Sequence, residues 1–197
     1  MLLSCKQFSD LDFEQLMAVY EQSNLENGSI FFPDDSPREQ MVKAEQEFSD
    51  YLRRDFFSVK GAFYCIWTEN GVYLSALRME PYKDGILLCA METKPSARSK
   101  GYATALLKAA LNEVDLPVYS HIRKGNRASV AVHRACGFRL QHEGARFLDG
   151  SVSSNSNTYI YIEKGGVLQG TADFRDYLPK VKSRFEGIEM ECYSSLL

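Results

Sequence analysis

A short stretch in the middle of the chain has the composition of an anion-binding loop. Glu92-Thr-Lys-Pro-Ser-Ala-Arg98-Ser-Lys-Gly101-Tyr-Ala103 lies between an apolar run and an amphipathic segment. The first amides of a helix have no partners within the helix, and the helix dipole places partial positive charge there. Gly101 lets the backbone approach a phosphate closely, and Arg98 and Lys100 add formal charge. The stretch therefore predicts a site for a phosphorylated small molecule.

Basic residues gather around this loop, although the whole chain of 197 residues has a net charge of −3. Residues 94–146 hold ten Lys and Arg and three acidic residues, a net charge of +7, whereas residues 1–93 have a net charge of −8. A basic region next to an acidic one suits a small anion better than a long nucleic acid, which the acidic part would repel. We therefore expect no nucleic-acid partner.

The cysteines and the apolar segments limit the classes of protein to which this chain can belong. The five cysteines are odd in number and scattered, without a CxxC pair or other metal-ligand spacing. This pattern favours a reducing, cytoplasmic location and no metal site. We find no secretory signal near the N-terminus and no apolar stretch long enough to span a bilayer, so we expect no membrane partner.

The pattern of apolar and turn residues predicts an α/β (α+β) fold with a β-α-β crossover in the middle. A capping box at Ser36 and Glu39 predicts the start of one helix, and Glu69-Asn70-Gly71 predicts a tight hairpin turn. We expect a loop over 26–35. The expected strands are 1–8, 62–68, 72–79, 86–93, 118–123, 138–147 and 158–163, and the expected helices are 12–20, 36–54, 101–114 and 126–136.

This order of elements and two motifs resemble the GNAT superfamily of acyl-CoA N-acyltransferases. The family's anion loop has Arg or Gln, two residues, Gly, one residue, then Gly or Ala, and Arg98-Ser-Lys-Gly101-Tyr-Ala103 matches it. The segment from Asn126 to Phe138 matches a second family pattern, except that His133 stands where tyrosine is expected. The resemblance is firm over residues 60–140. It implies a GNAT-like mixed, mostly antiparallel sheet with a splayed central parallel strand pair flanked by helices.

The resemblance divides the chain and implies a function. Residues 1–164 would form the acyltransferase domain, and residues 165–197 would be an extension of unknown role, with an extra helix or a dimer contact as options. The expected activity is an N-acetyltransferase that moves an acetyl group from acetyl-CoA to a primary amine of a small molecule or peptide. The alternative is a catalytically weak module that binds or senses acyl-CoA. The protein would be a monomer or a homodimer.

The resemblance also assigns cofactor contacts by position. The anion loop would wrap the pyrophosphate of coenzyme A, and the end of the preceding strand would offer backbone groups to the pantetheine arm, including an amide that polarises the thioester carbonyl. Asn126 also suits an ordinary helix N-cap, and Ser129 an ordinary helix-surface residue. The expected cofactor-binding residues are Met91, Glu92, Thr93, Arg98, Ser99, Lys100, Gly101, Tyr102, Ala103, Thr104, Asn126, Ser129 and His133.

Three residues are candidates for proton transfer. The family tyrosine is thought to protonate the leaving thiolate, so the resemblance implies this role of general acid for His133. A phenol has a pKa of about 10 and a histidine one of about 6.5, so the replacement would leave only a minority of the acid protonated at neutral pH. The alternative is a histidine that merely packs in its helix. Glu92 and His121 are candidate general bases, and the alternative is a water chain in place of a single base.

The acceptor side would come from residues 20–40 and from the hairpin after Phe138. This front region is acidic, and an acidic mouth would attract a cationic amine. Aromatic side chains would add a wall, although acidic loops are often simply solvated. The acidic residues are Glu21, Glu26, Asp34 and Asp35, and the aromatic ones are Tyr20, Phe31 and Phe32.

Overall fold

A seven-stranded sheet forms the middle of the molecule. The computed structural model describes residues 1–162, so the predicted extension at 165–197 lies outside the described residues. The strands follow the order β1-β2-β3-β4-β5-β7-β6 across the sheet. Their bounds are β1 (Leu2–Cys5), β2 (Phe63–Glu69), β3 (Val72–Tyr82), β4 (Gly85–Thr93), β5 (Val118–Arg123), β6 (Arg139–Arg146) and β7 (Val152–Tyr161).

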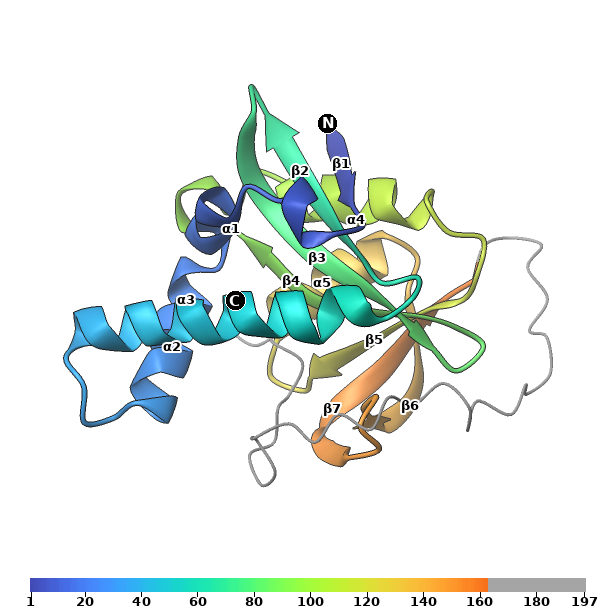
Figure 1. Cartoon of the computed structure of the whole chain (residues 1–197). Helices are drawn as coiled ribbons and strands as arrows, with labels where there is room; N and C mark the ends of the chain where they lie inside the picture. Colours follow the sequence, from blue (N-terminus) through green and yellow to red (C-terminus); the bar gives the residue numbers. More distant parts are fainter. Residues whose placement is uncertain (163–197) are drawn as a thin grey trace.

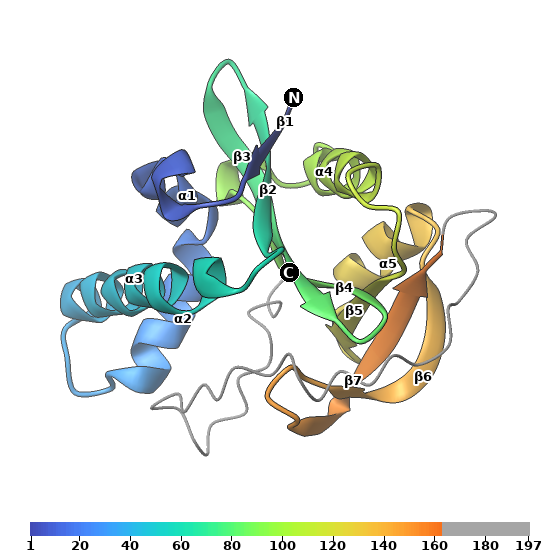
Figure 2. The same ribbon diagram turned by 45° about the vertical axis from the view of Figure 1, so that its right-hand side comes forward.

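Helices cover both faces of this sheet, with α1, α2 and α3 on one face and α4 and α5 on the other (Figures 1 and 2). The helix bounds are α1 (Phe13–Val19), α2 (Glu21–Phe31), α3 (Pro37–Arg54), α4 (Tyr102–Leu111) and α5 (Arg127–Ala135), with 3-10 turns at Phe8–Asp10, Phe56–Ser58 and Pro95–Ala97. Each face has its own apolar core. Leu16, Phe48 and Tyr64 belong to the first, and Leu106 and Phe138 belong to the second.

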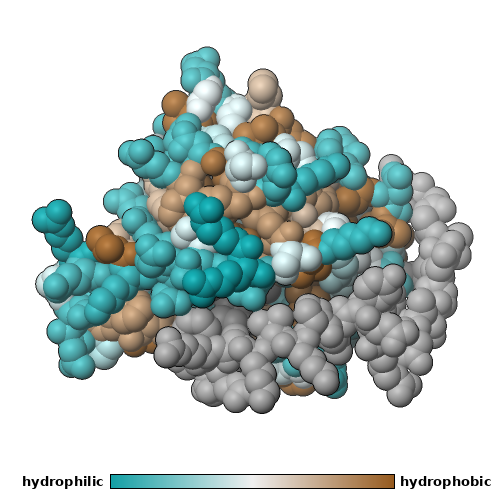
Figure 3. Space-filling view, viewed as in Figure 1, coloured by the Kyte–Doolittle hydropathy of each residue, from teal (hydrophilic) through white to brown (hydrophobic). Residues whose placement is uncertain are grey.

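The start and the orientation of α3 follow directly from its sequence. The Ser36 hydroxyl accepts from the Glu39 amide, the Glu39 carboxylate accepts from the Ser36 amide, and Pro37 takes the first helical position. The buried side chains Ala44, Phe48 and Leu52 recur every four residues and face the sheet. The outward face of α3 is largely hydrophilic (Figure 3). The structure thus confirms the predicted capping box.

Two segments differ from the sequence-based expectation. The stretch expected as a loop continues α2 to Phe31, because Gly28 serves close packing instead of a turn: a Cβ there would lie 2.7 Å from the Gln40 carbonyl oxygen. The polar stretch between the expected strands 138–147 and 158–163 is in fact largely strand, because β7 already begins at Val152. Its Ser153 and Ser156 are buried, and β7 pairs with both β5 and β6.

The parallel pair β4 and β5 diverges along its length. Gly85 lets the strands start close together, because a Cβ there would lie 2.0 Å from the Pro117 carbonyl oxygen. The strands pair in register from Ile86 with Val118 to Leu88 with Ser120. Beyond that point the two strands run on without pairing to each other, over residues 89–93 and 121–123. The other strand pairs are antiparallel. The predicted mixed sheet with a splayed parallel pair is therefore confirmed.

Candidate active site

The predicted anion loop connects the end of β4 to α4. Ser99 and Gly101 both have left-handed backbone conformations, with φ of 60° and 84°. Gly101 is the N-cap of α4, and no side chain caps the helix there. A Cβ on Gly101 would meet no atom within 4 Å, so the space in front of the helix start is open. The amides of Tyr102, Ala103 and Thr104 are therefore available to an anion.

The other side chains of the loop differ in direction. Ser99 and Lys100 are exposed, and the Lys100 ammonium donates to the Ser96 carbonyl 3.2 Å away. The Tyr102 hydroxyl donates to the Glu69 carboxylate at 2.7 Å, across the end of the β2–β3 hairpin. The loop therefore offers an anion backbone amides together with one exposed cationic side chain.

Arg98 does not extend in front of α4. Its Nε donates to the Thr93 carbonyl oxygen at 3.2 Å, and its Nη1 donates to the Gln22 side chain on α2. The Gln22 amide in turn donates to the Glu26 carboxylate at 2.9 Å. Arg98 thus joins the anion loop to α2 across the end of β4, and its charge lies near Glu92.

A bulge in β4 precedes the candidate base. Ala76 pairs with Glu92 and Arg78 pairs with Cys89, so Ala90 and the residue after it share the single position opposite Leu77 on β3. Ala90 has a φ of 49°, which is rare for a residue with a side chain. The buried Tyr20 hydroxyl donates to the Ala90 carbonyl oxygen at 2.6 Å. The sequence predicted Tyr20 as part of an aromatic wall on the acceptor side, whereas in the structure it is buried and its hydroxyl is bonded to this bulge.

Glu92 follows the bulge and is 5% exposed. Burial raises the pKa of its carboxyl to about 8, and the Ser23 hydroxyl and the Arg98 guanidinium nearby lower it by less. Its Oε1 has no hydrogen-bond partner among the described residues. A buried carboxyl with a pKa near neutrality and a free oxygen has the properties of a general base.

The second motif places three of the predicted residues along α5. Asn126 caps the helix, and its side-chain oxygen accepts from the Ser129 amide at 2.9 Å. The N-cap role that the sequence left open is therefore present. Ser129 is half-buried, and its carbonyl oxygen lies 2.8 Å from Nδ1 of His133, one turn further along.

His133 is 1% exposed, and its ring packs edge-on against Phe138 with the ring centres 4.9 Å apart. Burial lowers the pKa of its imidazole to about 4, which the bond to the Ser129 carbonyl only partly offsets. Nε2 is buried and has no hydrogen-bond partner among residues 1–162. A neutral ring with this bonding disfavours the role of general acid that the resemblance implied.

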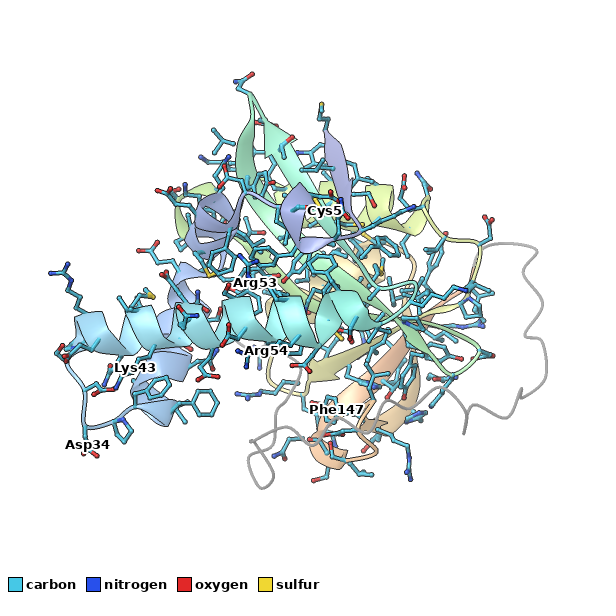
Figure 4. The ribbon with its side chains drawn as sticks, viewed as in Figure 1. Cys5, Asp34, Lys43, Arg53, Arg54 and Phe147 are labelled. Atoms are coloured by element: carbon cyan, nitrogen blue, oxygen red, sulfur yellow. The ribbon has the colours of Figure 1, made fainter. Side chains whose placement is uncertain are left out.

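His121 is held in a different environment, against the β6–β7 hairpin. Its Nε2 lies 2.9 Å from the Arg146 carbonyl oxygen, and its Nδ1 lies 3.1 Å from the Thr158 hydroxyl. Its ring packs edge-on against Tyr82 and against Phe147, which Figure 4 labels. Burial lowers the pKa of His121 to about 4. Because both ring nitrogens have protein partners, the contacts favour Glu92 over His121 as the candidate base.

The acidic front region is partly neutralised. Asp35 forms an ion pair with Lys43 of α3 at 2.5 Å. Asp34 lies at the outer tip of the loop between α2 and α3 (Figure 4). Glu26, by contrast, is half-buried and lies close enough to Glu92 to raise its pKa. Of the predicted acidic residues, Glu26 is thus the one that the structure joins to the candidate base.

Sequence reasoning missed the residues that surround Glu92 from the other face of the sheet. Gln22 and Ser23 lie in the first turn of α2, in a stretch without a motif, and only the packing of α2 brings them to the site. Ala90 gives no signal at all, because alanine does not favour a left-handed φ. Within residues 1–162, no helix is long and apolar enough to cross a membrane, and no three His, Cys, Asp or Glu side chains gather as a possible metal site.

Comparisons with known proteins agree with this arrangement. A model of the acetyltransferase (GNAT) family matches residues 29–138. No curated protein sequence matches the chain significantly. Among solved structures, the PaiA N-acetyltransferase from Thermoplasma acidophilum in complex with coenzyme A is 11% identical, with a TM-score of 0.56 over 81% of this chain and 98% of that chain.

Two further solved structures share the fold. An acetyltransferase of the GNAT family from Bacillus anthracis is 16% identical, with a TM-score of 0.53 over 82% of this chain and 94% of that chain. The ribosomal-protein-S18-alanine N-acetyltransferase from Escherichia coli is 17% identical, with a TM-score of 0.51 over 86% of this chain and 99% of that chain. At these identities the likeness concerns the fold alone.

Proposed function

The chain belongs to the GNAT acetyltransferase family, and we propose that it transfers an acetyl group from acetyl-CoA to the primary amine of a small molecule or peptide by direct attack. The observation that carries this proposal is the arrangement at the end of β4, where an uncapped helix start and a buried carboxyl lie within ten residues of each other. The coenzyme A bound to the PaiA N-acetyltransferase supports the same donor here. Buried free thiols support a cytoplasmic location, and a monomer or a homodimer fits the proposal.

The anion loop would hold the pyrophosphate of the donor. The first amides of α4 have no side-chain cap, and the space around a Cβ on Gly101 is open, next to the left-handed Ser99. Lys100 is exposed and adds a positive charge. These groups suit a doubly charged anion, because amides and the helix dipole act together at a helix N-terminus.

The splayed end of β4 would hold the pantetheine arm and the thioester. Residues 91–93 do not pair with β5, and an extended ligand can add to such an open strand edge through backbone hydrogen bonds. The bulge at Ala90 also removes the amide of Met91 from the regular pattern of pairing between β4 and β3. We assign the amide of Met91 to the thioester carbonyl oxygen, where it would stabilise the negative charge that develops during attack.

Glu92 would accept the proton that the attacking amine loses. Its carboxyl is deprotonated above a pH of about 8, and its Oε1 is free to accept a hydrogen bond from the amine. The amine lone pair forms the new C–N bond, the C–S bond breaks, and its electron pair leaves with sulfur. Overall, the acetyl group replaces one amine proton and one proton ends on the thiol of coenzyme A. Glu26 near Glu92 favours a cationic acceptor.

A thiol-release assay with acetyl-CoA and a panel of cationic, neutral and anionic primary amines tests the proposal. We expect release that depends on the amine and is fastest with cationic acceptors, and an acetamide product detectable by mass spectrometry. Calorimetric binding of acetyl-CoA without release for any amine would indicate a binding module instead. Release with anionic acceptors alone would overturn the assignment of the acceptor side.

A further inference from the structure

Arg98 has one nitrogen without a hydrogen-bond partner in the described part of the chain. Its Nε donates to the Thr93 carbonyl oxygen at 3.2 Å, and its Nη1 donates to the Gln22 side chain on α2. Nη2 is buried and has no partner among residues 1–162. Because the guanidinium is planar and rigid, the two bonds that hold it also fix the direction of Nη2. A buried donor without an acceptor is costly, so Nη2 suits a ligand that brings an oxygen.

Glu92 has the complementary atom. Its Oε1 is a buried acceptor that receives no hydrogen bond from the residues that the structure describes. Burial raises the pKa of this carboxyl, and the Ser23 hydroxyl and the charge of Arg98 lower it by less, so Arg98 lies near Glu92. No ion pair among the described residues joins the two side chains. One small ligand that carries both a donor and an acceptor would therefore satisfy both atoms.

Both side chains contact the helix that covers the acceptor side of the sheet. Gln22 and Ser23 are neighbours in the first turn of α2, and they contact Arg98 and Glu92 respectively. The anion loop leads into α4, which covers the opposite face (Figure 2). The Arg98 side chain therefore leaves the loop toward α2, although its place in the motif belongs to the cofactor side. This direction places Nη2 with the acceptor rather than with coenzyme A.

We propose that Arg98 and Glu92 together select an acceptor with an oxygen on the carbon next to its amine-bearing carbon. The amine donates to Oε1 of Glu92, and the oxygen accepts from Nη2 of Arg98. Because the two side chains lie close enough to influence each other, the two polar groups of the ligand must also lie close together. This arrangement occurs in 1,2-amino alcohols, through a hydroxyl, and at a peptide N-terminus, through a carbonyl. The inference rests on the proposed function for the reaction itself.

Matched amines test the proposal through their kcat/KM in the thiol-release assay. Ethanolamine and propylamine differ by a hydroxyl in place of a methyl group, and glycinamide and 2-methylpropylamine make the same comparison for a carbonyl oxygen. Rates are expressed per concentration of neutral amine, so that the different pKa values of the amines do not enter. A hydrogen bond from a charged donor predicts that the wild type prefers the oxygen-bearing amine by roughly 10- to 100-fold. A preference in the first pair alone identifies an amino alcohol, and one in the second alone identifies a peptide-like amine.

Variants at Arg98 test whether this residue causes the preference. In Arg98→Met the preference should disappear, whereas the affinity for coenzyme A by calorimetry should stay unchanged, because the side chain turns away from α4. The pH inflection of turnover should move upward, since the charge of Arg98 lowers the pKa of Glu92. Arg98→Lys keeps a charge and should retain part of the preference. Lys100→Met, at an exposed cation of the same loop, is the control and should leave the preference unchanged at saturating acetyl-CoA.

Other outcomes separate the inference from the proposed function. Equal losses for both members of a pair in Arg98→Met would give Arg98 a structural role in holding α2 and overturn the inference. A wild type without preference for either oxygen-bearing amine would overturn it as well, and this result does not depend on a folded variant. A wild type that releases no thiol with any amine would instead overturn the proposed function itself.

Discussion

The anion loop and the buried groups beside it use opposite means to act on a ligand. The loop lies at the surface and offers backbone amides, whose charge does not change with pH. Glu92, His121 and His133 lie at most 5% exposed, and burial moves the pKa of each one away from its ordinary value. The difference teaches that the two halves of the candidate site should respond differently to pH and to substitution.

Burial also moves the acid and the histidines in opposite directions. A carboxyl is charged when it loses its proton, so burial raises the pKa of Glu92 to about 8. An imidazole is charged when it gains one, so burial lowers the pKa of His133 to about 4. Near neutral pH the carboxyl of the candidate base is therefore mostly protonated, whereas both buried histidines are neutral.

Replacing the candidate base should give the largest effect. Glu92→Gln removes the proton acceptor and keeps the size of the side chain, so we expect turnover to fall by roughly 10²- to 10⁴-fold, the range that general base catalysis contributes. The affinity for coenzyme A should stay unchanged, because the anion loop is untouched. Glu80→Gln on β3 is the control, since Glu80 is also a buried carboxyl with a raised pKa. Equal losses of turnover in both variants would point to a general structural effect.

The buried histidines should make the protein sensitive to acid. Between pH 6.5 and 4 the unfolded chain protonates His133 while the folded chain does not, so the unfolded state binds more protons and stability falls as the pH falls. From the two pKa values, the cost at pH 5 relative to pH 7 is about 2 kcal/mol.

Urea unfolding at pH 7 and pH 5 measures this effect. His133→Phe should lose about 2 kcal/mol less than the wild type over this interval, whatever its stability at pH 7. His142→Phe, at an exposed position, should keep the pH dependence of the wild type. An unchanged pH dependence in His133→Phe would show that His133 is not buried as a neutral ring.

Coenzyme A should bind more weakly when a substitution strains the backbone of the anion loop. Gly101→Ala adds a side chain at a φ of 84° and places a methyl group in the space in front of α4. We expect roughly tenfold weaker binding of coenzyme A by calorimetry, with about 1 kcal/mol of lost stability from the strained φ. Gly150→Ala is a matched control, because Gly150 has a φ of 87° and open space around it, in the turn between β6 and β7. If both variants bind coenzyme A equally well, the loop is not the phosphate site.

The sequence predicted the features that depend on local pattern. The capping box of Ser36 and the N-cap of Asn126 are each set by residues three positions apart, and the regular spacing of apolar residues placed α4. Gly28 led to the wrong prediction of a loop, because the sequence does not distinguish a glycine in a turn from a glycine at a close contact between helices. Its role depends on Gln40 of α3, which only the tertiary structure brings near.

The chemistry of the site was less predictable, for the same reason. The resemblance implied a proton donor at His133, on the basis of an ordinary pKa. Its bond to Ser129 and its burial against Phe138 set the state of the ring, and neither is visible in the motif. Glu92 was identified from its place late on a central strand, but the bulge at Ala90 and the contact of Arg98 with α2 depend on packing between distant segments.

The pH dependence of turnover at saturating acetyl-CoA and amine tests the central claim, that a buried Glu92 accepts the proton of the acceptor. Two amines with different pKa values should be compared between pH 6 and 9 in the wild type and in Glu92→Gln. We predict that the wild-type rate rises through an inflection near pH 8 that is the same for both amines, and that this inflection is absent in Glu92→Gln. An inflection that follows the pKa of the amine and persists in Glu92→Gln would contradict the account.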